Sequence, residues 1–230
     1  MTPDDLAAAM EATWPAARSW SLGPWRLRDG AGGGKRVSAA TVEGDWQPAD
    51  IAAAEAAMDA PLFMIRPQDA ALDAALAGRG YRMIDPVVGY VAGTAGFDAA
   101  PRMTTFPHWP PLQIAADLWA EGHIGPERLR VMDRAAGPKT AILARANDRA
   151  VGVVYVAVHN TTAMLHALEI SAAHRRQGSA QNLMRAAAVW ARQNGADTLA
   201  LVVTEANAPA RRLYASLGMQ VVGQYHYRQK

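Results

Sequence analysis

Residues 165–180 have the sequence Leu165-His166-Ala167-Leu168-Glu169-Ile170-Ser171-Ala172-Ala173-His174-Arg175-Arg176-Gln177-Gly178-Ser179-Ala180. The first six residues are typical of a strand, and the last six form an Arg-x-x-Gly-x-Ala turn ahead of a helical pattern. The start of a helix leaves backbone N–H groups unpaired and carries partial positive charge, so small residues there let an anion approach the backbone. The stretch therefore predicts a strand, a turn that binds a pyrophosphate, and a helix.

The helix after the turn has one apolar face. Apolar side chains recur from Ala180 onward at helical spacing, at Leu183, Met184, Ala187, Ala188 and Ala191. Gln193-Asn194-Gly195 predicts the end of the helix, and Thr198–Thr204 is an apolar run typical of a covered strand. The order strand, turn, helix, strand indicates an α/β fold.

A second motif follows this strand. Asn207 can cap a helix, Pro209 fits its first turn, and Gly218 fits its end.

With these two motifs the chain resembles the GNAT superfamily of acyl-CoA-dependent N-acyltransferases. The family pattern is Arg/Gln-x-x-Gly-x-Gly/Ala, then Asn-x-x-Ala-x-x-Leu-Tyr-x-x-x-Gly-Phe. The matching residues are Arg175, Gly178, Ala180, Asn207, Ala210, Leu213, Tyr214 and Gly218. Met219 replaces the usual Phe, and Arg176 replaces a common Gly. The resemblance implies an α/β GNAT fold, a mixed central sheet flanked by helices, with acetyl-CoA as the cosubstrate.

The resemblance also implies binding roles for named residues. Backbone groups at Ile170 would hold the pantetheine arm of the cosubstrate. The pyrophosphate would lie among the backbone amides of Arg175, Arg176, Gln177, Gly178, Ser179 and Ala180. The Arg176 side chain would contact a phosphate or stay solvated on the surface. Asn207 would face the CoA arm or serve only as a helix cap.

Two residues are candidates for catalysis. Tyrosines at the position of Tyr214 donate a proton to the departing thiolate in many GNAT proteins, whereas the alternative role is a core aromatic. Glu169 is the candidate acceptor of the amine proton, and burial among apolar neighbours would raise the pKa of its carboxyl. The alternative for Glu169 is an ion pair with an arginine such as Arg175. Strand alternation places His166 on the face opposite Glu169, as a structural histidine or a weaker candidate base.

Composition narrows the function classes. The 230 residues carry a formal net charge of +2, which does not indicate a nucleic-acid partner. The chain has no cysteine, which excludes disulfides, thiolate metal sites and a cysteine nucleophile, so direct acyl transfer is expected. The six histidines show no metal-ligand spacing, and no metal is expected.

Targeting signals and the glycine-rich segment are also informative. No apolar run approaches the ~18 to 20 residues of a membrane span, and no export signal opens the chain, so a cytoplasmic location without membrane contact is expected. The segment Gly30–Lys35 fails the P-loop spacing and is expected to be a hairpin loop. Family analogy suggests that Arg36 and Ser38, just after it, reach the cleft of the second domain.

The motifs place a catalytic GNAT domain at residues 98–230. Three strands, Lys139–Arg145, Ala150–Val158 and Thr162–Ser171, are expected to form a meander. Two short helices, Pro111–Glu121 and Pro126–Arg134, precede them. Several prolines mark an extended connector before these helices and a boundary near Asp98.

Residues 1–97 are expected to form a degenerate GNAT-like domain. The segments Trp25–Arg28 and Arg36–Val42 are predicted to pair as strands across the glycine loop. A helix, a glycine and a strand ending in Val87–Val91 repeat the order at the end of the second part. No phosphate turn is present, so this half is expected to shape the pocket or to pack the core, as in tandem GNAT proteins.

The sequence thus predicts an N-acetyltransferase that moves an acetyl group from acetyl-CoA directly to a primary amine of a small molecule or a peptide. A noncatalytic acyl-CoA-binding sensor or interaction protein is the alternative. Another donor such as succinyl-CoA would need a cation near the acyl terminus. Exposed sheet edges would allow a homodimer.

Overall fold

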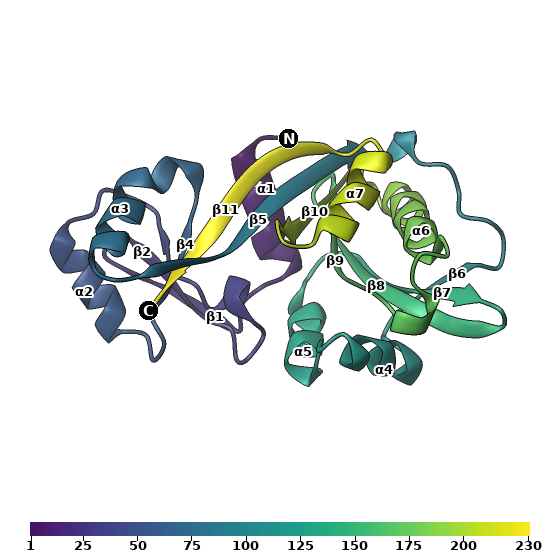
Figure 1. The fold of residues 1–230 in the computed structure, drawn as a ribbon, viewed down its shortest axis with the longest axis horizontal. Coiled ribbons are helices and arrows are strands. Elements are labelled where there is room, and N and C mark those ends of the chain that lie inside the picture. The colour runs from purple at the N-terminus through teal and green to yellow at the C-terminus, as the bar shows by residue number, and fades with distance from the viewer.

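An eight-stranded mixed sheet runs through both parts of the chain in the computed structural model, which describes all residues 1–230 (Figure 1). Its order is β4 (Leu62–Ile65), β11 (Gln220–Gln229), β5 (Arg82–Gly93), β10 (Thr198–Thr204), β9 (Thr162–Ile170), β8 (Arg149–His159), β7 (Lys139–Ala146) and β6 (Thr105–His108). Only β9 and β10 pair in parallel. The predicted α/β fold and the meander of β7, β8 and β9 are confirmed.

Helices cover both faces of the sheet. The helix α6 (Ser179–Gln193) and the helix α7 (Ala208–Ser216) pack on one face, and the five apolar residues predicted for α6 are all buried. The other face carries α1 (Pro3–Thr13), α4 (Gln113–Glu121) and α5 (Pro126–Arg134). The sheet therefore lies between two helical layers, in agreement with the nearly continuous burial along β7 and β8.

The N-terminal part also forms a smaller sheet. It consists of β1 (Arg18–Leu22), β2 (Trp25–Asp29) and β3 (Thr41–Val42), and it packs with α2 (Pro48–Ala56) and α3 (Ala70–Gly78) around a separate core. The prediction of a strand over Arg36–Val42 is wrong for most of its length. Lys35–Val37 is a single 3-10 turn, and only Thr41 and Val42 pair with β2.

The two halves of the chain exchange strands. Each half contains a strand, a helix and a strand: β4, α3 and β5 in the first, and β10, α7 and β11 in the second. β11 pairs with β4 of the first half, and β5 pairs with β10 of the second half, while β5 and β11 pair with each other. The last strand of each unit thus pairs with a strand of the other unit, and the origin of the first half as a degenerate GNAT domain stays a prediction. The predicted domain boundary at Asp98 lies in the loop after β5. Strands from both sides of this boundary belong to the same eight-stranded sheet.

Three elements are additional to the sequence prediction. They are α1, β1 and β6, the last of which lies in the proline-rich connector. Pro107 is tolerated in β6 because an edge strand leaves one row of backbone groups unpaired. A capping box between Thr2 and Asp5 marks the start of α1. No helix combines the length and the apolar character that crossing a membrane requires.

A half-buried carboxylate fastens α3 to β11. Asp73 accepts hydrogen bonds from Arg228 at 2.7 and 2.9 Å and lies 2.7 Å from His226 Nε2. These contacts, led by the hydrogen bonds from Arg228, lower the pKa of Asp73 from 3.8 to about 2, although partial burial opposes the shift. Because the pKa is lower in the folded state, the contribution to stability is complete above about pH 4 and is lost as the pH falls toward about 2.

We expect the substitution Asp73→Asn to lower the free energy of unfolding at pH 7 by roughly 2 kcal/mol, because a pKa shift of one unit corresponds to about 1.4 kcal/mol. Urea denaturation measures this change. Asp148→Asn is the control, since the Asp148 side chain pairs with Arg145 but is 89% exposed, and a loss below about 0.5 kcal/mol is expected. Equal losses for the two variants would contradict the role given to Asp73.

Candidate active site

The parallel strands β9 and β10 separate half-way along their length. They pair only from Thr162 to Leu165 on β9 and from Thr198 to Leu201 on β10. Beyond Leu165 the edge of β9 that faces β10 has no strand partner, whereas β10 stays paired with β5 on its other side as far as Thr204. The separation leaves an opening in the sheet, bordered by backbone groups that a ligand can pair with.

A bulge in β9 begins at this opening. His166 pairs with Tyr155 of β8, and Glu169 pairs with Val153, so β9 has one residue more than β8 in this interval. The extra residue is Ala167, with a φ of 52°, and its carbonyl accepts a hydrogen bond of 2.7 Å from the indole of the buried Trp119.

The bulge corrects one prediction about β9. Residues paired across antiparallel strands point to the same face, and Tyr155 and Val153 are two residues apart on β8. Their partners His166 and Glu169 therefore share a face. The predicted placement on opposite faces is wrong, because the additional residue reverses the alternation.

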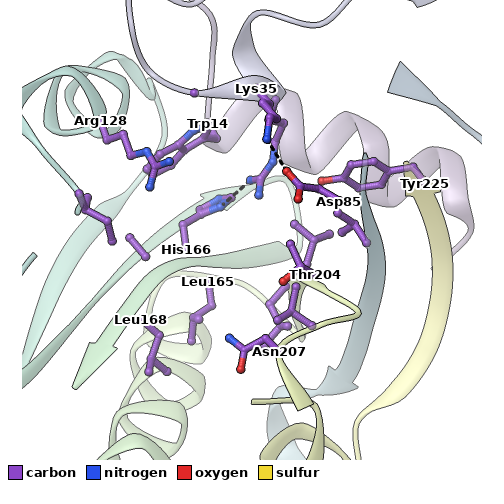
Figure 2. A pocket seen from close by; sticks show the side chains of 18 of the residues that line it. Trp14, Lys35, Asp85, Arg128, Leu165, His166, Leu168, Thr204, Asn207 and Tyr225 are labelled. Carbon is purple, nitrogen blue, oxygen red and sulfur yellow. Dashed lines mark hydrogen bonds and ion pairs between the residues drawn. The ribbon is translucent and has the colours of Figure 1, made fainter. Parts of the chain in front are cut away.

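A cavity of about 480 Å³ occupies the opening. Figure 2 shows Leu168 and Asn207 at one end, Lys35 and Arg128 at the other, and His166 and Leu165 between them. Residues from both halves of the chain line it, including Gly33 to Arg36 from the N-terminal part. Arg36 thus reaches the cleft as expected, whereas Ser38 does not line it and instead donates to the carbonyl of Gly34.

The turn before α6 presents a row of free backbone donors. No N–H group from Arg175 to Gln181 donates to a backbone or side-chain acceptor, and α6 has no side-chain cap. Gly178 has a φ of 86°, and a Cβ added to it would meet no atom within 4 Å. The row includes the amides of the predicted cofactor residues Arg176, Gln177, Ser179 and Ala180. A row of unpaired amides around an uncrowded glycine suits an anion.

Arg175 links this turn to β9. Its guanidinium donates to the carbonyl of Ile170 at 3.0 Å and to the carboxylate of Glu169 at 2.9 Å. Glu169 lies against Gly122, beyond α4, and does not line the cavity. The structure thus places the candidate base Glu169 beside the turn before α6, outside the cavity that Tyr214 lines.

Tyr214 lines the cavity from α7. Its side chain is buried, and its ring packs on Tyr90 with centroids 5.6 Å apart. Burial, with a smaller contribution from Tyr90, raises the pKa of Tyr214 to about 12, so the hydroxyl keeps its proton at neutral pH. No other group of the protein shares a hydrogen bond with this hydroxyl.

Asn207 precedes Tyr214 at the start of α7. Its side-chain oxygen accepts a hydrogen bond of 3.2 Å from the amide of Ala210, which is the cap predicted from the sequence. The side chain also lines the cavity, where Figure 2 shows it near Leu168 and Thr204. Both alternatives considered for Asn207 are compatible with this position.

Comparison with known proteins identifies the family. The model of the Acetyltransferase (GNAT) family matches residues 107–219, which include β9, β10, the turn before α6 and Tyr214. The chain carries a GNAT acetyltransferase domain.

Other proteins share both halves of the chain around this GNAT domain. The uncharacterized N-acetyltransferase YobR of Bacillus subtilis is 24% identical over an alignment of 239 positions, gaps included, that covers 95% of each protein. A GCN5-related N-acetyltransferase from Kribbella flavida has a TM-score of 0.73 at 16% identity and covers 100% of this chain and 96% of its own. A conserved protein of unknown function from Staphylococcus epidermidis has a TM-score of 0.71 at 12% identity and covers 94% of each chain. These structural likenesses extend the shared fold to the N-terminal part.

A buried histidine connects the GNAT domain to the N-terminal part. His166 Nδ1 lies 3.1 Å from Arg36 Nη1, and its Nε2 lies 2.9 Å from Thr13 Oγ1. Burial, together with the nearby Arg36 charge, holds the pKa of His166 well below its usual range, so the ring is neutral. Arginine can only donate, so Nδ1 is the acceptor and Nε2 carries the proton. This arrangement is the hydrogen-bonded structural histidine that the sequence suggested.

The sequence did not single out four cavity residues, Trp14, Lys35, Asp85 and Arg128. They come from four separate segments, and only the fold brings them together. Clusters of three or more His, Asp or Glu side chains that could hold a metal ion do not occur in the structure.

The position of Glu169 gives a prediction for the GNAT domain. The ion pair with Arg175 indicates a positioning role, so we expect Glu169→Gln to weaken coenzyme A binding by about 3- to 10-fold through a less ordered Arg175. In this variant the fall of kcat at acidic pH should occur at the same pH as in the unaltered protein. Calorimetry and a pH–rate profile of the variant measure the two effects. Loss of that fall with unchanged coenzyme A affinity would instead support Glu169 as the proton acceptor.

Proposed function

We propose that this protein transfers the acetyl group of acetyl-CoA directly to a primary amine of a small molecule or a peptide. The observation that carries the proposal is the row of unpaired amides from Arg175 to Gln181, which follows the open edge of β9 in the chain, while the cavity at Tyr214 lies along that edge. A diphosphate at the turn and an extended amide arm along β9 would use both sets of free backbone groups.

The proposed reaction has one covalent step. The neutral amine nitrogen attacks the thioester carbonyl carbon, the bond from carbon to sulfur breaks, and the thiolate leaves with the electron pair. We assign the proton that this thiolate takes up to the hydroxyl of Tyr214, which is protonated at neutral pH and lines the cavity.

The proton released by the amine needs a second group. Glu169 is the candidate from the sequence, but its carboxylate lies beside Arg175 and does not line the cavity, so we assign this proton to a water molecule and give Glu169 the role of positioning Arg175. The pH–rate profile of Glu169→Gln tests this assignment.

A noncatalytic acyl-CoA sensor is the second candidate function. Two features of the cavity favour an enzyme over a sensor. The Tyr214 hydroxyl is free of protein partners, and the cavity extends past the thioester end as far as Arg128, which leaves room for an acceptor.

Incubation of the purified protein with acetyl-CoA and a panel of primary amines tests the proposal. We expect thiol release that depends on the amine, and an acetylated amine identified by mass spectrometry. Tight binding of acetyl-CoA without turnover of any amine would overturn the enzyme and leave the sensor.

A further inference from the structure

The end of the cavity distant from Asn207 is rich in positive charge. Three cationic side chains line the cavity, Lys35, Arg36 and Arg128, against one carboxylate, Asp85. Lys35 and Asp85 form an ion pair with each other, as Figure 2 shows. Two guanidinium groups therefore remain without a carboxylate partner.

Arg36 is only partly satisfied by the protein. Its Nη1 donates to the neutral ring of His166, and its buried Nε has no hydrogen-bond partner. The phenol groups of Tyr225 and Tyr227 are polar neighbours of Arg36, and burial raises the pKa of Tyr227 well above its usual value, so Tyr227 offers no negative charge at neutral pH. The position of this guanidinium is nevertheless fixed, because His166 is in turn held by Thr13.

Arg128 is half-buried, and its side chain forms no ion pair or hydrogen bond with the protein. It extends from α5 over the glycine loop, where a Cβ on Gly34 would lie 3.5 Å from both its Nε and its Nη2. Figure 2 shows the Arg128 side chain at the cavity, beside Trp14.

Three other sheltered arginines of this chain have carboxylate partners, whereas Arg134 donates to the carbonyl of Pro15. Arg28 pairs with Glu11, Arg66 with Asp69 and Arg228 with Asp73. Removing a guanidinium from water without a counter-charge is unfavourable, and its planar donors suit the two oxygens of a carboxylate or a phosphate. Two such groups at one end of a cavity indicate that the missing counter-charge belongs to a ligand.

We propose that the acceptor is a primary amine that carries a carboxylate or phosphate group, which Arg36 and Arg128 bind while the amine faces Tyr214. This inference rests on the proposed function and adds the chemical class of its acceptor. The anion belongs to the acceptor and not to the acyl group, because Arg128 and the turn that carries Lys35 and Arg36 lie at the end of the cavity opposite Leu168 and Asn207.

Matched pairs of amines test the proposal. The amines are glycine, β-alanine, 4-aminobutyrate and 2-aminoethyl phosphate; each amino acid is paired with its neutral amide and the phosphate with ethanolamine. With acetyl-CoA as donor, at least one anionic amine should exceed its neutral partner in kcat/KM by about 10- to 100-fold, since a charged hydrogen bond contributes ~1.5–3 kcal/mol. The carboxylate and phosphate arms separate the two sources of the anion.

Arginine variants provide the second readout. Arg128→Gln should reduce the ratio between the anionic amine and its neutral partner to near one, while the affinity for coenzyme A stays unchanged. Arg130→Gln is the matched control, because Arg130 lies on the same helix, pairs with Glu127 and is 58% exposed. It should keep the full ratio, and thermal unfolding checks that both variants are folded.

Three results would overturn the inference. Equal rates for anionic and neutral amines would remove it and leave the acetyltransferase intact. Faster transfer from succinyl-CoA than from acetyl-CoA to neutral amines, lost in Arg128→Gln, would place the anion on the donor. Absence of turnover with every amine would remove the proposed function, and this inference with it.

Discussion

We expect Gly178→Asp to weaken the binding of coenzyme A by about 100-fold or more, equivalent to roughly 3 kcal/mol. The new carboxylate would lie at the turn that carries the unpaired amides, since a Cβ on Gly178 meets no atom within 4 Å. It would take up these donors and repel the diphosphate proposed to bind there. Isothermal titration calorimetry with coenzyme A measures the change.

Gly195→Asp is the matched control. Gly195 has a φ of 83°, and a Cβ added there also meets nothing within 4 Å, but it lies at the opposite end of α6. Asp is among the residues that tolerate this backbone region, and both variants carry the same strain and the same added charge. Equal losses of affinity in the two variants would contradict a diphosphate site at Gly178.

A large loss of turnover is expected for Tyr214→Phe. The value of kcat should fall by about 10²- to 10⁴-fold, the usual contribution of a positioned general acid, because the thiolate would leave without a proton. Coenzyme A affinity should hardly change, since phenylalanine keeps the ring contact with Tyr90. Steady-state rates of thiol release, together with calorimetry, separate the two effects.

Tyr90→Phe serves as the control for this prediction. The Tyr90 hydroxyl accepts a hydrogen bond from Arg211 and does not line the cavity, so its removal should leave kcat within about 3-fold. An unchanged kcat in Tyr214→Phe would show that another proton donor serves the thiolate.

The sequence predicted those parts of the fold that depend on local patterns. The apolar face of α6, the strands β7 to β9 and the ends of α7 all follow from residue periodicity and from capping residues such as Asn207. The exchange of β5 and β11 between the halves could not be predicted, because it depends on pairing between residues far apart in the chain. A single bulge at Ala167 was enough to reverse the predicted faces of His166 and Glu169.

The candidate site also contains one part that the sequence predicted and one part that only the structure revealed. The turn from Arg175 to Ala180 and the position of Tyr214 lie within contiguous motifs that can be read directly from the sequence. The cations at the other end of the cavity come from the turn after the glycine loop and from α5. Family analogy suggested that Arg36 reaches the cleft, but nothing in α5 alone marks Arg128 as a neighbour of the same cavity. Sequence therefore indicated the cosubstrate, while the tertiary structure was needed to infer the class of acceptor.

Calorimetric titration of the unaltered protein with coenzyme A and with acetyl-CoA tests the central claim most directly. Free amides at the entrance of α6 should give saturable binding at one site per chain, weakened selectively by Gly178→Asp. Absence of binding by the folded protein would contradict the claim and the acetyltransferase mechanism that depends on it.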